Sequence, residues 1–396
     1  MTVAKIRLVR LRREVTSMEG VKRSTTAKRD ELAAFMQITL GHLWTTNLSL
    51  NGAKVTAYLQ GVNISTLETC LGGIRNALHA IKAGNNAQAT SDISAVAAPC
   101  TQLEGGTTAG LVYPFDFADP DVIHVGSTYY AYATNSVGGN IQIIESTNLS
   151  HWTAAGSALP HLPTWASANY TWSPSVAFIG GKYDLYYAVD PTGSTSECIS
   201  VATSASPLGP FVDSSTAPME CQPSLGGAID PDAFVDASGA VFLLWKTGAA
   251  GSAKIWAQAL DPSGTTLAAG TNPSSILAPD QAWEGGNVEA PDLVEANGRY
   301  VLFFSGNDWS SANYAIGAAQ CATPLGPCSD VSSAPLFATG AGIAGPGSES
   351  VFPDASGDMW IAFDAWNPGS VGGSNSRGFY VRHVNLSGTP SVGGPP

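Results

Sequence analysis

The chain has 396 residues, of which 44% are hydrophobic and only 12% charged, and its 43 Gly and 25 Pro give a turn-rich composition that excludes a disordered chain and a helical bundle. The formal net charge of −13 is uneven, because residues 1–47 hold nine Lys/Arg and four Asp/Glu, which leaves −18 on the rest. An acidic body argues against nucleic-acid binding, which needs a basic face, and it suits a neutral substrate or a bound cation.

Residues 1–47 are predicted to be a weakly ordered basic extension, since they contain no repeat. Residues 1–29 are basic but are not followed by the apolar segment of a signal peptide, and the longest apolar run is too short to cross a bilayer. From this sequence we therefore expect neither a visible export signal nor a membrane span.

Residues 48–104 are predicted to form a small helical appendage. Ser65-Thr66-Leu67-Glu68 is typical of a capping box. The apolar residues that follow recur at steps of three and four, as on an amphipathic helix, at Leu67, Cys70, Leu71, Ile74, Leu78 and Ile81. Such a stripe usually packs against a core, so we expect a structural role for it. Residues 105–108 are the predicted linker.

From residue 110 onward one short phrase returns five times, with intervals of 54, 57, 60 and 60 residues. Each copy runs on into a Gly or Asn turn and an aromatic-rich strand, and a third strand follows. The copies are Asp119-Pro120-Asp121-Val122, Ser173-Pro174-Ser175-Val176, Asp230-Pro231-Asp232-Ala233, Ala290-Pro291-Asp292-Leu293 and Ser350-Val351-Phe352-Pro353. This period, built from short strands, is typical of β-propeller blades. The prediction is an all-β protein in which residues 105–396 form a five-bladed β-propeller catalytic domain, with a small N-terminal helical extension.

Three copies of the phrase carry an acid at or beside one equivalent position. Asp119 and Asp230 precede the prolines of the first and third copies, and Glu289 lies two residues before Pro291. Inner strands of a propeller line its axis, so these three acids are predicted to converge in a central funnel. Crowding there raises the pKa of at least one of them, as a general acid at neutral pH requires.

The order and spacing of these motifs resemble those of glycoside hydrolase family 43, the five-bladed arabinanases, arabinofuranosidases and xylosidases. The motifs are Phe117-Ala118-Asp119-Pro120-Asp121, Thr171-Trp172-Ser173-Pro174, Ala228-Ile229-Asp230-Pro231-Asp232, Val288-Glu289-Ala290-Pro291 and Gly345-Pro346-Gly347. The resemblance spans residues 110–390 and says nothing about residues 1–104.

The resemblance implies a role for each matching acid. Asp119 would be the general base that activates water, Glu289 the general acid, and Asp230 the residue that holds Glu289 and keeps its pKa raised. The family inverts the anomeric centre, which asks for two carboxyl groups roughly 6.5–9.5 Å apart. The alternative is that acids here only cap strands or accept backbone amides, which fits the second acids of the phrase better: Asp121, Asp232 and Asp292.

Four further residues are predicted to bind substrate. Trp172 and Trp309 could each stack on a sugar or pack within the blades. Asn287 could donate to a hydroxyl or serve an ordinary turn. Arg377 resembles the arginine that the family sends into its pocket, with a surface position as the alternative.

The chain departs from the family in the fifth blade. Ser348, followed by Glu349, stands where many members carry a His near a central cation, and Asp364 stands at another position that is often His. No cofactor is expected for the chemistry. A structural calcium in the central channel, held by Glu349 or Asp364, is the weaker expectation.

The six cysteines show no metal-site spacing and are expected to form disulfides, which favours an oxidising, secreted setting. Their local order suggests Cys70–Cys100, Cys198–Cys221 and Cys321–Cys328. The missing export signal conflicts with this setting, and the alternative is a cytosolic protein with free thiols.

Taken together, the sequence predicts a monomeric hydrolase that cleaves α-L-arabinofuranosyl linkages in hemicellulose or pectin-derived polysaccharide, with no nucleic-acid or membrane partner. A β-xylosidase on the same scaffold is the close alternative. A non-catalytic carbohydrate-binding propeller is the rival from another class.

Overall fold

The computed structural model describes residues 76, 110–136, 139–373 and 375–396. The basic extension predicted for residues 1–47 lies outside the described residues. So does the helical appendage predicted for residues 48–104, apart from residue 76, together with the predicted Cys70–Cys100 disulfide. Within the described residues, no helix is long and apolar enough to cross a bilayer.

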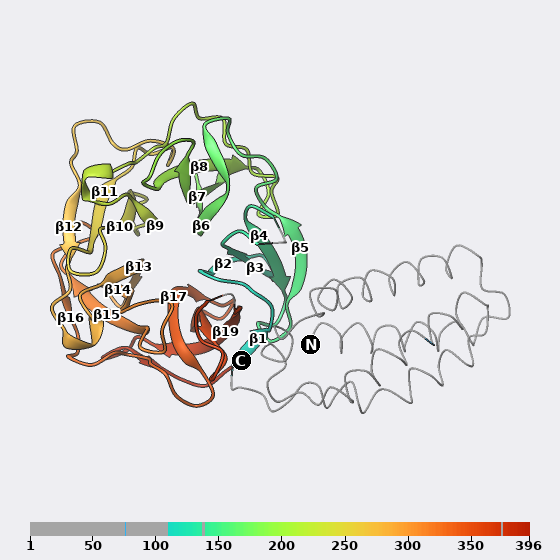
Figure 1. Cartoon of the computed structure of the whole chain (residues 1–396), viewed down its shortest axis with the longest axis vertical. Coiled ribbons are helices and arrows are strands. Elements are labelled where there is room, and N and C mark those ends of the chain that lie inside the picture. Colours follow the sequence, from blue (N-terminus) through green and yellow to red (C-terminus); the bar gives the residue numbers. More distant parts are fainter. Residues whose placement is uncertain (1–75, 77–109, 137–138, 374) are drawn as a thin grey trace. The chain divides into compact units, whose positions relative to one another are not determined.

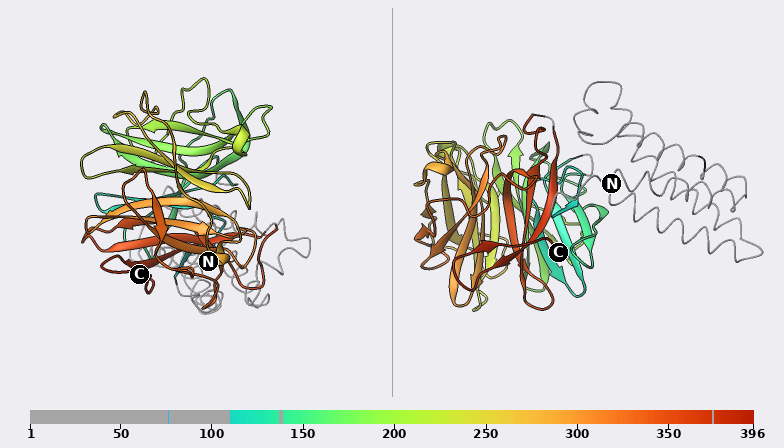
Figure 2. Two further views of the ribbon diagram at one scale, coloured as in Figure 1. Left: turned by 90° about the vertical axis from the view of Figure 1, so that its left-hand side faces the viewer. Right: turned by 90° about the horizontal axis from the view of Figure 1, so that it is seen from below.

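Five antiparallel sheets surround a central axis, as the five-bladed prediction required (Figure 1). Blade one contains β2 (Asp121–Val125), β3 (Thr128–Ala133), β4 (Gln142–Ser146) and β5 (Thr153–Ser157). Blade two contains β6 (Ala166–Ile179), β7 (Lys182–Pro191) and β8 (Cys198–Ser204). Blade three contains β9 (Ile229–Val235), β10 (Val241–Thr247), β11 (Lys254–Ala259) and β12 (Ser274–Leu277). Figure 2 shows the same sheets from two other sides.

Blades four and five complete the ring. Blade four contains β13 (Val288–Ala296), β14 (Arg299–Gly306), β15 (Ala315–Cys321) and β16 (Cys328–Asp330). Blade five contains β17 (Ala344–Pro353), β18 (Met359–Trp366), β19 (Arg377–Asn385) and β20 (Ser391–Val392), together with β1 (Leu111–Tyr113). The strand β1 comes from the start of the propeller and pairs with β19 near its end, so the first and last parts of the domain share one sheet. This pairing closes the ring.

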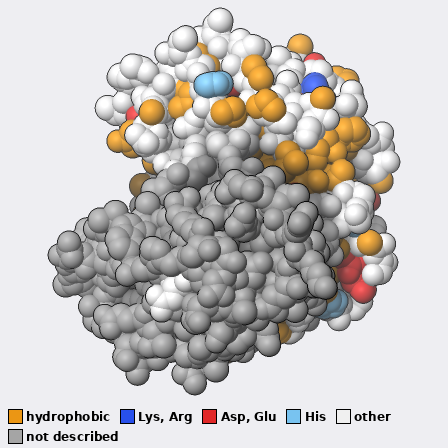
Figure 3. Space-filling view, turned by 90° about the vertical axis from the view of Figure 1, so that its right-hand side faces the viewer, with side chains coloured by type: hydrophobic (Ala, Val, Ile, Leu, Met, Phe, Trp, Pro, Cys, Tyr) orange, Lys and Arg blue, Asp and Glu red, His pale blue; other side chains and the backbone are white. Residues whose placement is uncertain are grey.

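Alternating apolar residues place the core between neighbouring blades. Tyr132 of blade one packs with Leu185 and Tyr187 of blade two, and Leu244 of blade three packs with Leu302 and others of blade four. On the face shown in Figure 3, most of the described side chains are uncharged, in keeping with a chain of few charged residues.

The inner strands β2, β6, β9, β13 and β17 are joined by a closed circle of side-chain to backbone hydrogen bonds, which we call the axial ring. In each, the third residue of the phrase accepts the N–H of the fourth residue in the next blade. The five bonds are Val176 to Asp121 (2.8 Å), Ala233 to Ser175 (3.1 Å), Leu293 to Asp232 (3.0 Å), Val351 to Asp292 (2.7 Å) and Val122 to Ser350 (3.1 Å).

The axial ring corrects the predicted fifth copy of the phrase. Ser350, and not Phe352, takes the place of the third residue, so the copy begins two residues earlier than predicted and reads Ser348-Glu349-Ser350-Val351. Backbone dihedrals agree, because the first residue of every copy has a left-handed φ: 52° at Asp119, 47° at Ser173, 52° at Asp230, 49° at Ala290 and 50° at Ser348. The glutamate therefore replaces the proline of the other four copies.

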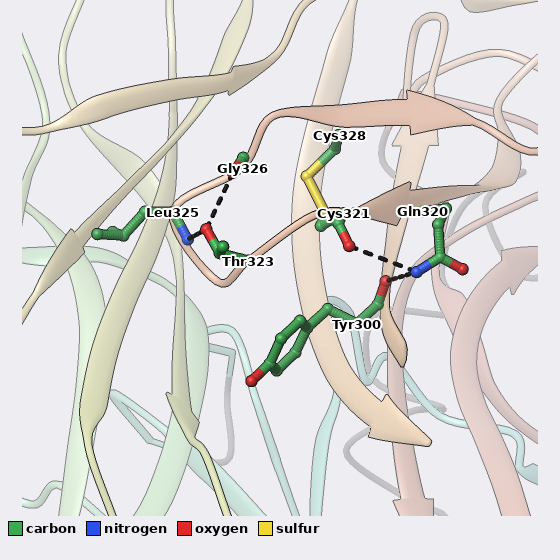
Figure 4. The surroundings of a disulfide bond; sticks show 7 residues. All are labelled: Tyr300, Gln320, Cys321, Thr323, Leu325, Gly326 and Cys328. Atoms are coloured by element: carbon green, nitrogen blue, oxygen red, sulfur yellow. Dashed lines mark hydrogen bonds between the residues drawn. A yellow bond between two sulfur atoms is a disulfide. The ribbon is translucent and has the colours of Figure 1, made fainter. Parts of the chain in front are cut away.

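Two predicted disulfides, Cys198–Cys221 and Cys321–Cys328, are present. The second joins β15 to β16 across a turn in which the Thr323 hydroxyl donates to the Gly326 carbonyl (Figure 4). This turn and its counterpart in blade two share a left-handed glycine before a cis proline, at Gly326 and Gly209. In blade four the turn leads to the outer strand, as predicted.

Candidate active site

A cavity lies on the propeller axis and is lined by the phrase residues of all five blades. Asp119 and Asp230 are among its lining residues, and Ala290, which follows Glu289, is another. The left-handed backbone of the first phrase residue costs of order 1 kcal/mol or more for a residue other than glycine. Such outliers cluster at functional sites, and here the same one recurs in every blade.

Asp119 is held by cationic and neutral donors together. Arg377 approaches its two carboxylate oxygens at 2.9 and 3.5 Å, and the Thr134 hydroxyl donates to Oδ2. The backbone N–H of Asp119 donates to Asp364 at 2.7 Å. The Asp119 side chain keeps 14% exposure, so solvent or substrate can reach it.

Asp230 is buried and lies between blades two and four. Its Oδ1 accepts the Ser173 hydroxyl at 2.7 Å, and its Oδ2 accepts the N–H of Ala290 at 3.1 Å. Burial, helped by the nearby charge of Glu289, raises the pKa of Asp230 to about 6, against the opposing effect of Lys246. Asp230 therefore fixes the backbone directly after Glu289.

Glu289 pairs with a buried lysine. Lys246 of β10 donates to its Oε2 at 3.1 Å, and the two side chains are only 10% and 9% exposed. Burial lowers the pKa of Lys246, but the neighbouring Glu289 and Asp230 outweigh it, and the pKa is raised overall. The ammonium is therefore charged and fixes one oxygen of Glu289.

A continuous path of contacts joins the three acids. Thr134 donates to Asp119 and its hydroxyl accepts the N–H of Ser173, at 3.0 Å. Ser173 donates to Asp230, which in turn binds the peptide group that follows Glu289. Acids from blades one, three and four thus converge at one place, with carboxyl groups that can accept or donate protons to one ligand.

Arg377 is buried among aromatic rings and acids, so the surface alternative for this residue is wrong. It lies 3.0 Å from Asp364, and its guanidinium carbon is 5.0 Å from the Trp309 ring and 5.9 Å from the Trp366 ring. The adjacent carboxylates, acting against burial, raise its pKa further above its ordinary value. It neutralises part of the acidic funnel.

The remaining predicted residues occupy the rim or its support. Trp309 is 46% exposed although Trp366 stacks on it at 6.2 Å and Arg377 lies over its ring, so part of the ring remains accessible. Trp172 is half-buried beside the exposed Tyr170, at 6.0 Å between rings. Asn287 is buried and donates to the Asn307 carbonyl at 2.9 Å, which favours the structural reading of its amide.

The acids of the axial ring are structural by geometry. Asp121, Asp232 and Asp292 each accept a backbone N–H from the next blade. Burial raises the pKa of Asp121 and of Asp232 to about 7, and that of Asp292 more strongly.

The central channel offers few protein ligands for calcium. Asp364 binds Arg377 and the Asp119 N–H through Oδ2, and its Oδ1 is buried without a partner. Glu349 accepts the Ser305 hydroxyl at 2.8 Å and keeps one buried oxygen without a partner. Among the described residues, no three side chains of Asp, Glu, His or Cys bring ligand atoms together in the channel. These residues do not fit a calcium site there.

Several site residues were not found by sequence reasoning. Lys246 and Ser173 contact the acids from other blades, Thr134 contacts Asp119 within blade one, and Asp364 was considered only as a calcium ligand. Two of them left a signal. Lys246 is a lone lysine at the end of an apolar run, and Ser173 stands in its copy of the phrase where Asp119 stands in the first.

Comparison with known proteins agrees with this geometry. The family model of the glycosyl hydrolases family 43 matches residues 111–389. The chain is 27% identical over 245 residues to the extracellular endo-α-(1→5)-L-arabinanase 1 of Bacillus subtilis. This match covers 58% of this chain and 73% of that relative.

Two solved structures share the fold at 27% identity. A thermostable family-43 glycoside hydrolase matches with a TM-score of 0.64, over 71% of this chain and 93% of its own. An endo-1,4-β-xylanase from Bacteroides thetaiotaomicron matches with a TM-score of 0.62, over 72% and 97%.

Proposed function

Because the chain belongs to glycosyl hydrolases family 43, we propose that this glycoside hydrolase inverts the anomeric centre as it cleaves α-L-arabinofuranosyl linkages in arabinan or arabinoxylan. The observation that carries the proposal is the contact path joining Asp119, Asp230 and Glu289 at one end of the axial cavity. The arabinanase relative supports the choice of sugar.

In the proposed mechanism Asp119 takes a proton from a water molecule as that water attacks the anomeric carbon. Arg377 and Thr134 keep the Asp119 carboxylate oriented toward the sugar. Glu289 gives its proton to the departing glycosidic oxygen, so one bond to carbon forms as the other breaks. No cofactor enters this chemistry.

Asp230 is the positioning residue of the proposal. It holds the peptide bond after Glu289 and adds negative charge beside it, which favours the protonated form that a general acid needs. The positive charge of Lys246 opposes this effect of Asp230, and its ion pair with Glu289 fixes the Glu289 side chain. The exposed face of Trp309, next to Arg377, is proposed to stack on a sugar ring.

A second candidate is a xylan-directed activity, which the likeness to the endo-1,4-β-xylanase structure favours. Chromogenic arabinofuranoside and xyloside substrates, assayed side by side together with linear arabinan, separate the two. Release from the arabinofuranoside or from arabinan is the expected result. Turnover of the xyloside alone would favour the second candidate, and binding without any turnover would favour the non-catalytic propeller.

We also propose that the protein is secreted. Two disulfides in the described residues and the extracellular arabinanase relative support this localisation. Detection of the native chain in culture medium, with both disulfides intact by mass spectrometry, is the corresponding test; retention in the cytosol with reduced cysteines would contradict it.

A further inference from the structure

Three carboxylates meet away from the funnel, at the periphery where blades three and four adjoin. Asp280 and Glu284 lie in the loop between β12 and β13, and Asp330 ends the outer strand β16. One carboxylate oxygen from each residue lies within 4.8 Å of the others. Figure 1 shows the strands β12 and β16 next to each other at the outer edge of the propeller.

Glu284 is fully buried, yet only half of its carboxylate has a partner. Its Oε2 accepts the N–H groups of Asp280 and Gln281, at 2.7 and 2.8 Å, as the capping box of the short helix η2 (Ala282–Glu284). Its Oε1 is buried without any hydrogen-bond partner. A carboxylate oxygen buried without a partner costs free energy of folding, so we expect a ligand at this oxygen.

Asp330 supplies a second, independent sign of the same kind. Both of its carboxylate oxygens are buried without a hydrogen-bond partner. Within the part of the chain that the structure describes, no Lys, Arg or His forms an ion pair with any of the three acids. Asp280 is exposed, and therefore opens one side of the group to water.

We propose that Asp280, Glu284 and Asp330 bind one calcium-type divalent cation, which we call the rim site. All of its protein donors are carboxylate oxygens, which hard cations prefer and which lack the His or Cys typical of zinc. Oxygens on opposite sides of a Ca²⁺ ion lie about 4.6–5.2 Å apart, since each Ca–O bond is about 2.3–2.6 Å. The three donors all lie within 4.8 Å of one another, close enough to share one such ion. Water on the Asp280 side would complete the coordination.

The alternative to a bound cation is a proton shared by the three acids. Burial, together with the neighbouring charges of Glu284 and Asp280, raises the pKa of Asp330 to about 8. Either a proton or a cation therefore relieves the repulsion at neutral pH. The cation also satisfies Glu284 Oε1 and both Asp330 oxygens at once, which a single proton cannot do.

A cation at the rim site would brace the segment that carries the proposed general acid. The Glu284 carbonyl accepts the N–H groups of Asn287 and Asn307, at 3.0 and 2.7 Å, and Asn287 lies two residues before Glu289. The ion would tie this segment to β16, which the Cys321–Cys328 disulfide already joins to β15. The rim site would thus be structural, and it does not depend on the proposed substrate.

The test is calorimetric titration of Ca²⁺ into the full chain after removal of divalent ions by a chelator, with thermal unfolding measured in parallel. In the wild type, Ca²⁺ should bind and raise the unfolding temperature. Asp330→Asn and Glu284→Gln should each weaken binding by about tenfold or more, the loss that even outer-shell partners of metal ligands cause. Gln at position 284 retains the oxygen that caps η2, so this variant is expected to fold.

Glu349→Gln is the matched control, because it alters a channel acid with an unpaired buried oxygen and leaves the rim site intact. It should retain the wild-type Ca²⁺ affinity. Loss of binding in Glu349→Gln with unchanged binding in Asp330→Asn would move the ion to the channel and overturn the proposal. Failure of the wild type to bind millimolar Ca²⁺ at pH 8 would overturn it too and would favour the shared proton.

Discussion

Asp119 and Glu289 each contact a basic residue, but the two contacts differ. Arg377 is itself held between Trp309, Trp366 and Asp364, so Asp119 faces a fixed planar cation. Glu289 faces the single ammonium of Lys246 at the end of a flexible stem. The proposed base is thus held through both oxygens by a fixed partner, whereas the proposed acid is held by the ammonium through one oxygen.

Replacing Glu289 by Gln should lower kcat on arabinan by about 10²–10⁴-fold, because proton donation to the leaving oxygen is lost. Aryl arabinofuranosides with acidic leaving groups need little such help and should be affected far less. Steady-state kinetics on both substrates measures the difference. Asp119→Asn is the matched control and should slow both substrates alike. If Glu289→Gln also slowed both substrates alike, Glu289 would not be the acid.

Replacing Lys246 by Met should move the alkaline limb of the pH–rate profile to higher pH. The Lys246 ammonium opposes the burial that raises the pKa of Asp230, the acid beside Glu289, so its removal should let this pair of acids keep a proton to higher pH. The measurement is kcat/KM against pH on arabinan. Lys246→Arg retains the charge and should keep the limb near its original place. A limb that stays fixed in the Met variant would show that Lys246 serves packing alone.

The acids could be predicted from the sequence because each stands within two residues of a proline in a phrase that repeats with the blades. Their partners could not. Lys246 and Ser173 approach the acids from neighbouring blades and Thr134 from a different strand of the same blade, and no local spacing records which residues face one another across the funnel.

At the scale of elements, the axial ring explains why the phrase recurs. Its third residue is Asp or Ser in every blade, the residue types that can accept a backbone N–H at short range. The five bonds join each inner strand to the next and close on the first. The fifth copy was placed two residues too late because it lacks the proline that marks the other four, whereas the structural constant is the accepting side chain.

Asp232→Ala should lower the free energy of unfolding by about 1–3 kcal/mol, because the buried N–H of Leu293 loses its acceptor. Asp232→Asn keeps an acceptor oxygen and should cost less. Urea denaturation of the two variants and the wild type gives the comparison. Equal stability of the Ala and Asn variants would mean that the axial ring contributes nothing at this position.

At the scale of the whole molecule, the buried acids predict an unusual dependence of stability on pH. Burial raises the pKa of Asp121 and Asp232 to about 7, and that of Glu349 and Asp364 to about 8. In the unfolded chain these groups titrate near pH 4. Between about pH 4 and pH 8 the folded protein therefore binds more protons than the unfolded chain, so stability falls as pH rises.

Unfolding temperatures should accordingly be higher at pH 5 than at pH 8, at constant Ca²⁺ and ionic strength. The acids whose pKa is lowered, such as Asp236 with its Ser238 hydrogen bond, act only below about pH 4 and leave this window unaffected. Glu349→Gln should flatten the dependence, because an amide does not titrate. Stability that rises steadily from pH 5 to pH 8 would contradict the assignment of these acids as neutral in the folded state.

The propeller as a whole was predictable because a blade is a local unit whose strands and turns recur with one period. Ring closure was not, since β1 and β19 lie at opposite ends of the domain and only their pairing shows which strand completes blade five.

The central claim is that acids from three blades act on one glycosidic bond and one attacking water. Proton NMR of the first sugar released from linear arabinan, recorded before mutarotation, tests it most directly. The account predicts that the newly formed reducing end is β, the product of inversion at an α linkage. A first product with the α configuration, or none from a folded protein, would contradict it.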